Sequence, residues 1–307
     1  MTRIHWATKL KTYIKRGLSE KMNLPRPTSW PYISGDSFRS LAQYVLDESQ
    51  SFNPRLVHTG DVIFVRTNYL EEFSKKYQPL IGVDTKFILI SHNEDMEVDE
   101  TLIQLIDFTK CQHWFAENLQ VSHPRISPIP IGLANFYSHQ NGDISFFEKN
   151  GNSQNNNSPR EKFIFWDFTV GSNKTIRLEA EKELEKFPLS VHTHFNKQEE
   201  YYKYLTTITH IASPRGRGED CNRTWEALYF GASPIVVKSV LTEHFKTLGI
   251  PLTIIKSWRD LHDEAWLGKF KNHSYSFDTI RPVDIEALWM PFWANQIQQK
   301  RTSCFNQ

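Results

Sequence analysis

The residues with the clearest chemical content occupy one stretch, SPRGRGEDCNRTWEALYFGASPIVV, at residues 213–237. Two glycines alternate with arginines in a short loop, and an arginine and a glutamate follow three positions apart. The candidate residues are Arg215, Gly216, Arg217, Gly218, Arg223 and Glu226. Glycine lets the backbone approach an oxygen-rich ligand closely, and arginine binds phosphate oxygens through two parallel hydrogen bonds. This set of residues therefore predicts a diphosphate site.

A helix expected at residues 222–230 would strengthen that site. Its N-terminus would present unpaired N–H groups and the positive end of the helix dipole to the loop. Glu226 would share a helix face with Arg223, and its carboxylate could accept both hydroxyls of a ribose. The competing interpretation is a solvated loop followed by a surface ion pair worth ~0.3 kcal/mol. The succession of strand, glycine loop, helix and strand favours the binding site.

The elements around this loop alternate between strand and helix. Strands are expected at residues 162–167, 189–193, 210–213, 233–238 and 252–255, and helices at residues 175–187, 201–207, 222–230 and 284–298. The runs KFIFWD and SPIVVK are continuously apolar at their centres, which is typical of buried parallel strands. Such a sheet binds ligands at the carboxyl ends of its strands. Lys174 and Arg177 follow the first of these strands and would add positive charge near the phosphates; the alternative is a normal helix surface.

The first half of the chain shows the same alternation. Strands are expected at residues 61–65, 86–91 and 126–131, and helices at residues 37–48, 69–77 and 101–107. The polar run NGNSQNNNSP at residues 150–159 predicts an exposed linker between the halves. We therefore expect an α/β protein of two domains, residues 1–155 and 156–307, with the last helix packing back on the first domain. The substrates would lie in a cleft between the two domains.

Candidate acid–base groups follow the strand FILI of the first half, at the sequence SHNED of residues 91–95. Sugar transfer with inversion needs one base to take the proton of the acceptor hydroxyl. Asp95 is the first choice for this base, and His92 and Glu94 come next. A simple polar turn, with Asn93 or Asp95 capping a helix, explains these residues nearly as well.

Two further polar residues, His58 and Asp61, flank the preceding strand and could line the acceptor side of the same cleft. His58 is equally explained as a surface residue. No D-x-D triplet, the usual carboxylate set for a divalent metal in such reactions, occurs in the sequence. We therefore expect no metal, with arginines and a helix terminus neutralising the leaving group.

The 213–237 segment resembles the donor-site signature of the exostosin family of glycosyltransferases. That signature has a Pro-Arg-Gly element, an arginine early in the next helix, a glutamate three residues later and a Gly-x-x-Pro-Ile-Val ending. A weaker likeness to viral and bacterial exostosin-like proteins extends through HTGDVIFVRTNYLEEF, FILISHNED, WFAENL and HPRISPIPIGLAN of the first half. The animal members are Golgi membrane proteins, so the heparan-type substrate of those members is not expected here.

The resemblance implies two Rossmann-like domains of the GT-B type facing a cleft, and an inverting transfer of sugar to a glycan or glycoconjugate. The donor would be a nucleotide diphosphate sugar, UDP- or GDP-linked, acting as substrate, and no cofactor is implied. By the resemblance Arg223 binds the diphosphate, Glu226 binds the ribose, and Arg215 to Gly218 form the phosphate loop. An inactive glycan- or nucleotide-binding module on the same scaffold is the alternative. A Rossmann oxidoreductase is disfavoured because no strand is followed by G-x-G-x-x-G.

Composition excludes several other classes. Lys plus Arg (36) nearly equals Asp plus Glu (35), so the global positive charge of a nucleic-acid-binding protein is missing. The three cysteines are widely spaced and predict neither a disulfide framework nor a zinc site. Residues 1–18 show no long apolar run, which predicts a cytoplasmic protein. Their basic, helically spaced pattern favours a helix docked on its own domain, with peripheral contact to an anionic membrane as the alternative.

Overall fold

The protein is described by a computed structural model that covers residues 26–136, 142–151, 160–271 and 282–305. The chain forms two compact units, Met1–Ile144 with Trp289–Gln307, and Ser145–Leu288. The basic segment 1–18 and most of the predicted linker lie outside the described residues. Within the described residues, no helix is both long enough and apolar enough to cross a membrane.

The first unit is built on a five-stranded parallel sheet with the order β1-β2-β3-β4-β5. Its elements are α2 (Gly35–Arg39), β1 (Tyr44–Leu46), β2 (Val62–Arg66), α3 (Leu70–Glu72), β3 (Phe87–His92), α4 (Glu100–Ile103), β4 (Cys111–Ala116), β5 (Ile126–Pro128) and α11 (Met290–Ser303). A π-helical stretch, Phe73–Tyr77, continues α3. The strands follow one another across the sheet in chain order, so no reversal of strand order occurs among them.

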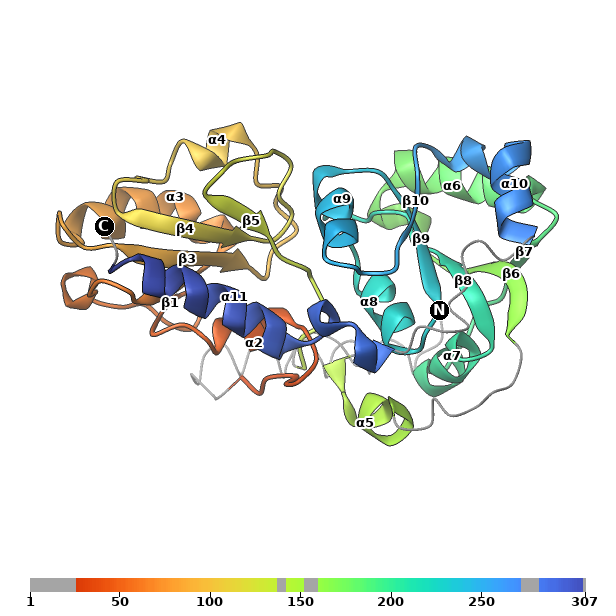
Figure 1. The fold of residues 1–307 in the computed structure, drawn as a ribbon, viewed down its shortest axis with the longest axis horizontal. Helices are drawn as coiled ribbons and strands as arrows, with labels where there is room; N and C mark the ends of the chain where they lie inside the picture. Colours follow the sequence, from red (N-terminus) through yellow and green to blue (C-terminus); the bar gives the residue numbers. More distant parts are fainter. Residues whose placement is uncertain (1–25, 137–141, 152–159, 272–281, 306–307) are drawn as a thin grey trace. The chain divides into compact units, whose positions relative to one another are not determined.

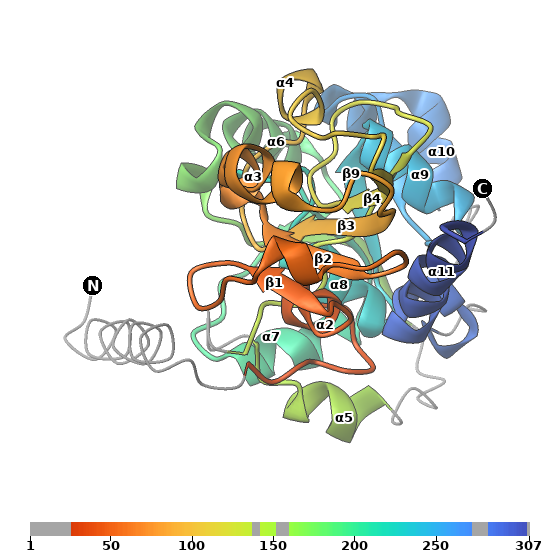
Figure 2. The same ribbon diagram turned by 90° about the vertical axis from the view of Figure 1, so that its left-hand side faces the viewer.

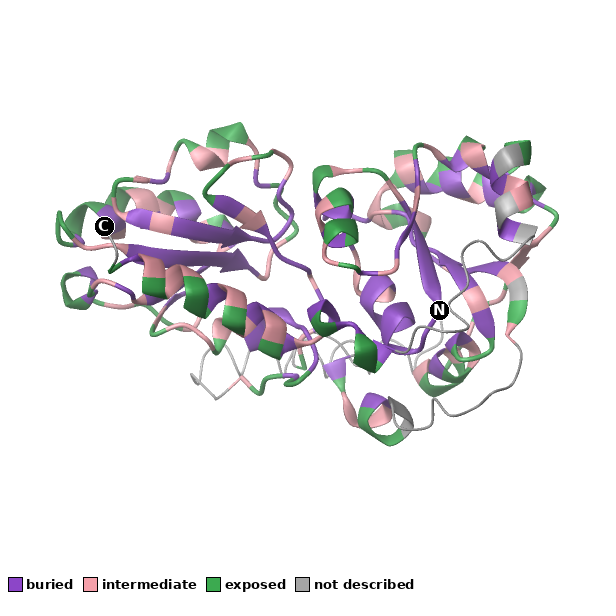
Figure 3. Ribbon diagram, viewed as in Figure 1, coloured by how far each residue is buried: buried purple, intermediate pink, exposed green. Residues whose placement is uncertain are grey.

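Both faces of this sheet are covered because its strands are apolar on both sides. On one face Ile63, Val65 and Leu89 pack with Leu70 and Phe73 of the α3 region in a single core. On the other face α11 lies along β3 and β4 and contacts α2 (Figure 1, Figure 2). The last helix therefore belongs to the first unit. Figure 3 shows most strands of the two sheets as buried, although the edge strand β7 is not, whereas α11 has one buried and one exposed side.

The predicted helix at residues 37–48 is wrong. The helix α2 ends at Arg39, and Tyr44–Leu46 forms the strand β1 beside β2. Val62 donates its N–H to the Gln43 side chain at 2.8 Å, and Gln43 donates its own N–H to Val62 O at 3.0 Å. This pairing with a strand far along the chain outweighs the local apolar spacing that suggested a helix. The strand β4, Cys111–Ala116, had no sequence-based prediction.

The second unit also has a five-stranded parallel sheet, in the order β10-β9-β8-β6-β7. Its elements are α5 (Ser145–Gly151), β6 (Glu161–Trp166), α6 (Lys174–Lys186), β7 (Ser190–His192), α7 (Gln198–Leu205), β8 (Ile208–Ala212), α8 (Asn222–Tyr229), β9 (Ser233–Val237), α9 (Val240–Thr247), β10 (Thr253–Ile255) and α10 (Glu264–Lys271). The chain moves from β6 outward to β7, then returns to place β8 on the other side of β6. This order reverses between β6 and β8, which is the topological switch point of a doubly wound sheet.

Alternate side chains of β6 anchor helices on opposite faces of this second sheet. Ile164 packs with Ala180 and Leu184 of α6 in one core. Phe165 contacts Tyr204 of α7 instead, with ring centroids 5.0 Å apart. The strands predicted for this half and its first three predicted helices are confirmed with small shifts of their ends, because each strand is a short apolar run bounded by polar residues. The helix predicted at residues 284–298 instead begins at Met290 and ends at Ser303, and α9 and α10 had no sequence-based prediction.

Candidate functional site

The candidate site of the second unit lies at the carboxyl edge of β6 and β8. Asp167 directly follows β6, and the loop of residues 213–221 runs from β8 to α8. The N-terminus of α6, capped by Asn173, lies against this loop, because the Asn173 side chain donates to Gly216 O at 2.9 Å. Ligands of doubly wound sheets bind outside the strand ends at such a reversal of strand order. The sheet therefore brings the predicted glycine loop to the expected edge.

Arg177 holds this loop from within. The guanidinium donates to Arg215 O at 3.1 Å, to Thr169 O at 2.8 Å and to Pro214 O at 3.3 Å. Its side chain is buried, so the alternative interpretation of a normal helix surface is wrong for this residue. Burial lowers the pKa of Arg177, and the positive charge of Arg223 acts in the same direction. A Cβ on Gly216 would lie 3.1 Å from the Arg177 guanidinium, so a side chain there would press against this arginine.

Arg223 and Glu226 lie on the first turns of α8, as the sequence predicts. Arg223 donates to the main-chain oxygen of Asp167 at 2.6 Å, so the helix and the end of β6 are joined. Burial opposes its charge, yet the negative groups around it, Glu226 and Asp167 included, raise its pKa. Glu226 is only 5% exposed, and the Tyr202 hydroxyl donates to it at 3.3 Å. Burial raises the pKa of Glu226 to about 6, with Arg223 opposing the shift.

The remaining donor-site candidates differ in how they are held. Arg215 pairs with Glu219 inside the loop. Arg217 is the exposed residue of this loop, whereas Gly218 is buried. Lys174 is exposed at the first position of α6. The arginines of this edge are therefore ordered by contacts with the protein, and their charges are partly balanced by carboxylates.

The structure adds His194 to the same edge. It lies just beyond β7, and its Nδ1 atom is 3.2 and 3.4 Å from the two carboxylate oxygens of Asp167. The rule that selects polar residues after a parallel strand would have found His194, since the predicted strand ended at residue 193.

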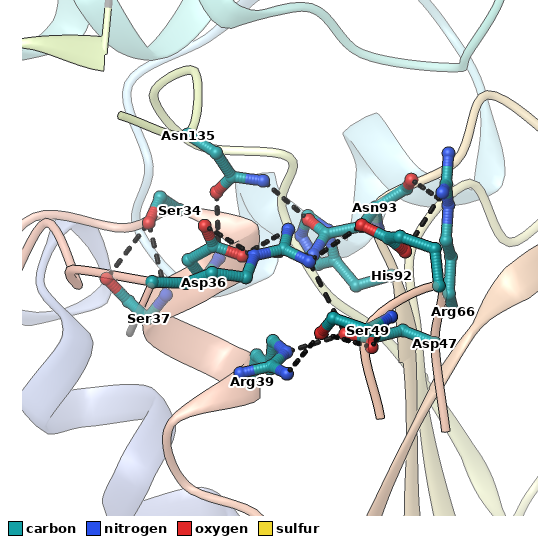
Figure 4. A network of polar contacts seen from close by, with 12 residues as sticks. Ser34, Asp36, Ser37, Arg39, Asp47, Ser49, Arg66, His92, Asn93 and Asn135 are labelled. Carbon is teal, nitrogen blue, oxygen red and sulfur yellow. Dashed lines mark hydrogen bonds and ion pairs between the residues drawn. The ribbon is translucent and has the colours of Figure 1, made fainter. Parts of the chain in front are cut away.

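The carboxyl edge of the first sheet carries a second polar cluster, which we call the Arg26 network. Arg26 contacts Asp36 at 2.7 Å, Glu48 at 2.9 Å and Asp47 at 3.4 Å. Figure 4 shows Asp36 and Asp47 among the other polar side chains of this edge. Burial works against ionisation of Asp47, but hydrogen bonds from Arg39 and Ser49 lower its pKa. Burial raises the pKa of Asp36 in spite of Arg26 beside it.

The predicted acid–base residues border this network. Glu94 pairs with Arg66 at 3.1 Å, and Arg66 also pairs with Glu48 at 2.9 Å. Asp95 is exposed. Asn93 stands between Glu94 and His92 with a left-handed backbone (φ 66°), and its side chain donates to Asp36 at 3.3 Å. Such backbone strain in a residue other than glycine is common at functional sites.

His92 is enclosed. Its Nε2 atom lies 3.0 Å from Pro130 O, and its Nδ1 atom lies 3.0 Å from a carboxylate oxygen of Glu117. Both side chains are 2% exposed. Glu117, which follows β4, was not found from the sequence because β4 was not predicted. His92 therefore contacts protein groups through both ring nitrogens.

His58 and Asp61 lie at the other edge of the first sheet. Both precede β2, whereas Glu94 and Asp95 follow β3, and the two strands are parallel. Asp61 accepts the main-chain N–H of His58 at 2.7 Å, and the His58 side chain is 82% exposed. The structure does not bring these two residues together with His92, Glu94 and Asp95.

Several residues of the Arg26 network have no sequence signal of their own. They are Arg26, Asp36, Arg39, Asp47, Glu48, Arg66 and Asn135. They come from separate parts of the first unit, and only the sheet and the turn before α2 bring them together. Their spacing along the chain matches no motif.

The two edges differ in the chemistry they can perform. The second unit offers ordered arginines, a helix N-terminus and a buried carboxylate, which suit a diphosphate joined to a ribose. The described residues contain no group of three or more His, Cys, Asp or Glu side chains arranged to hold a metal ion.

No protein-family model matches this chain. A search of curated proteins likewise finds no match to it.

Proposed function

We propose that this protein is an inverting, metal-independent glycosyltransferase that uses a nucleotide diphosphate sugar, with the second unit binding the donor. The proposal rests chiefly on Arg223 and Glu226, which α8 holds at the carboxyl edge where the strand order reverses. Arg223 contacts the end of β6, and Glu226 is enclosed beside Tyr202. An arginine binds phosphate oxygens through two parallel hydrogen bonds, and a carboxylate one helical turn further along accepts hydrogen bonds from hydroxyls.

The roles follow from the chemistry of the transfer. As the bond from the sugar to the terminal phosphate breaks, negative charge grows on the leaving diphosphate. Arg223 and the N-terminus of α8 would stabilise that charge, and Glu226 would accept the ribose hydroxyls. The base that takes the acceptor proton is assigned to Asp95 of the first unit, the exposed carboxylate after β3. The finer architecture proposed is the GT-B type, with two Rossmann-like units.

The likeness of residues 213–237 to the exostosin donor signature supports this proposal independently of the geometry. It covers the loop, the arginine, the glutamate and the following strand in one continuous run. A solvated loop with a surface ion pair, the alternative interpretation, would leave Glu226 in water. Glu226 is buried instead.

The proposal is tested by thermal unfolding in the presence of UDP, GDP and their sugars. A nucleotide at 100 times its dissociation constant should stabilise the protein by ~2.7 kcal/mol. Arg223→Ala should abolish this effect, and Arg223→Lys should restore only part of it, because lysine keeps the charge without the two-pronged donor. Arg259→Ala is the matched control, since that side chain is 79% exposed on the same unit. Absence of stabilisation by every nucleotide would refute the proposal.

A binding module without catalysis is the second candidate, and one observation favours it. His92 is enclosed and Glu94 is paired with Arg66, so two of the three predicted acid–base residues are already engaged. The Asp95→Asn variant separates the two candidates. In an enzyme it should keep nucleotide binding and lose most of the sugar transfer to glycan acceptors. Nucleotide binding without any transfer or donor hydrolysis by the unaltered protein would favour the binding module.

A further inference from the structure

Asp167 and His194 leave the second sheet side by side. They follow β6 and β7, neighbouring parallel strands in which Trp166 pairs with His192. The rings of Trp166 and His192 stack with centroids 4.1 Å apart and an interplanar angle of 13°. The backbone pairing of β6 with β7 sets the register of the two strand ends. His194 is therefore directed to Asp167 by the sheet itself, and not by a flexible surface contact alone.

The contact between the two side chains orients the imidazole. The Nδ1 atom of His194 faces both carboxylate oxygens of Asp167, at 3.2 and 3.4 Å. A carboxylate accepts hydrogen bonds, so Nδ1 carries the proton. Nε2 then lies on the opposite side of the ring, and the side chain is 71% exposed. A ligand can reach Nε2 from solvent.

Asp167 also connects His194 to the candidate donor site. Its main-chain oxygen accepts from Arg223 at 2.6 Å, while its carboxylate accepts from His194. Two nitrogen donors from different elements are thus anchored on one residue. The other titratable groups acting on Arg223 are Glu226, Tyr201 and Cys221. Arg223 supplies one positive charge beside Asp167, whereas the terminal phosphate of a nucleoside diphosphate carries up to two negative charges.

We propose that His194, oriented by Asp167, binds the terminal phosphate of the nucleoside diphosphate beside Arg223. This inference rests on the proposed function and assigns a second phosphate ligand to that site. In its doubly protonated form the ring donates Nδ1–H to Asp167 and Nε2–H to a phosphate oxygen. During transfer the electron pair of the sugar–phosphate bond goes to the phosphate oxygen, the acceptor oxygen bonds to the sugar, and the acceptor proton goes to the base. His194 keeps its proton and stabilises the charge on the leaving group.

Calorimetric titration with UDP and UMP, and with GDP and GMP, tests this assignment without knowledge of the sugar or acceptor. His194→Ala should weaken diphosphate binding about 10-fold and leave monophosphate binding within about 2-fold, because one charged hydrogen bond to the terminal phosphate is lost. Asp167→Asn should weaken diphosphate binding less, about 3-fold, since the ring loses its charged partner. That variant spares the contact with Arg223, which uses the main-chain oxygen.

His192→Ala is the matched control because this histidine ends the same strand and stacks on Trp166. It should leave the preference for diphosphate over monophosphate unchanged. If it lowers that preference as much as His194→Ala, the loss comes from the strand ends and the assignment is overturned. An unchanged preference in His194→Ala also overturns it, while the proposed function stands. If the unaltered protein binds no nucleotide at all, the proposed function fails and the assignment fails with it.

Discussion

The carboxyl edges of the two sheets use the same residue types in opposite ways. In the first unit arginines pair with carboxylates, as Arg26 does with Asp36, Asp47 and Glu48. In the second unit arginines donate mostly to main-chain oxygens, as Arg177 and Arg223 do. Charges paired with each other leave little net field, whereas an arginine on neutral carbonyls keeps its positive charge. The second edge is therefore the better anion site.

The strand order accounts for part of this difference. The second sheet reverses its order between β6 and β8. Ligands of doubly wound sheets bind at such a reversal, outside the carboxyl ends of the strands. The described strands of the first sheet follow in chain order, and their polar ends contact one another instead.

Replacing Arg177 should produce the largest effect and tests whether the second edge depends on one residue. Arg177→Ala leaves three loop carbonyls without their donor and should lower the free energy of unfolding of the second unit by about 3 kcal/mol. Hydrogen exchange followed by mass spectrometry should show the loss of protection in the loop after β8 and in α6. Arg259→Ala, at an exposed position, should cause no such loss. Equal loss of protection in the first sheet would break the comparison between the units.

Replacing Asp47 tests whether the first edge is held by its ion pairs. Asp47→Asn removes the charge that Arg39 and Arg26 share, so the free energy of unfolding of the first unit should fall by about 2 kcal/mol near neutral pH. The lowered pKa of Asp47 implies a contribution that is present above its usual pKa and is lost as the pH falls through its lower folded-state value. The variant should therefore lose less stability in acid than the unaltered protein.

Denaturant titrations at a series of acidic pH values measure this difference. Asp36 shifts in the opposite direction, so only the comparison with the Asp47→Asn variant isolates the contribution of Asp47. Identical acid profiles of the two proteins would show that the network of the first edge does not depend on this carboxylate.

Replacing Glu226 tests the buried carboxylate that distinguishes the second edge. Its pKa is raised from 4.5 to about 6, so its ionisation costs stability, and this cost appears as the pH rises through that window. Relative to Glu226→Gln, the unaltered protein should lose about 2 kcal/mol of unfolding free energy between these pH values. Urea titrations at intervals across the window measure it. If the unfolding free energies of the two proteins change with pH in parallel, Glu226 lies in a solvated environment. The distinction between the two edges would then be removed.

Local patterns predicted the second unit better than the first. Its strands are apolar runs separated by glycine or polar residues, and the loop of residues 213–221 contains its own glycines, arginines and helix start. Neighbouring residues in the chain carry that site, so the sequence alone could indicate it. In the first unit Gln43 pairs with Val62, and this distant contact decides that the residues directly after Gln43 form the strand β1.

The sequence by itself determined an alternating α/β chain, the position of the glycine loop and the placement of Arg223 and Glu226 on one helix. These features depend on spacing within a few residues. Only the tertiary structure decided that Arg177 is buried in the loop, that Glu117 faces His92, and that Asp167 joins His194 to Arg223. Such contacts depend on which strands lie side by side, and strand order is set by packing between distant segments.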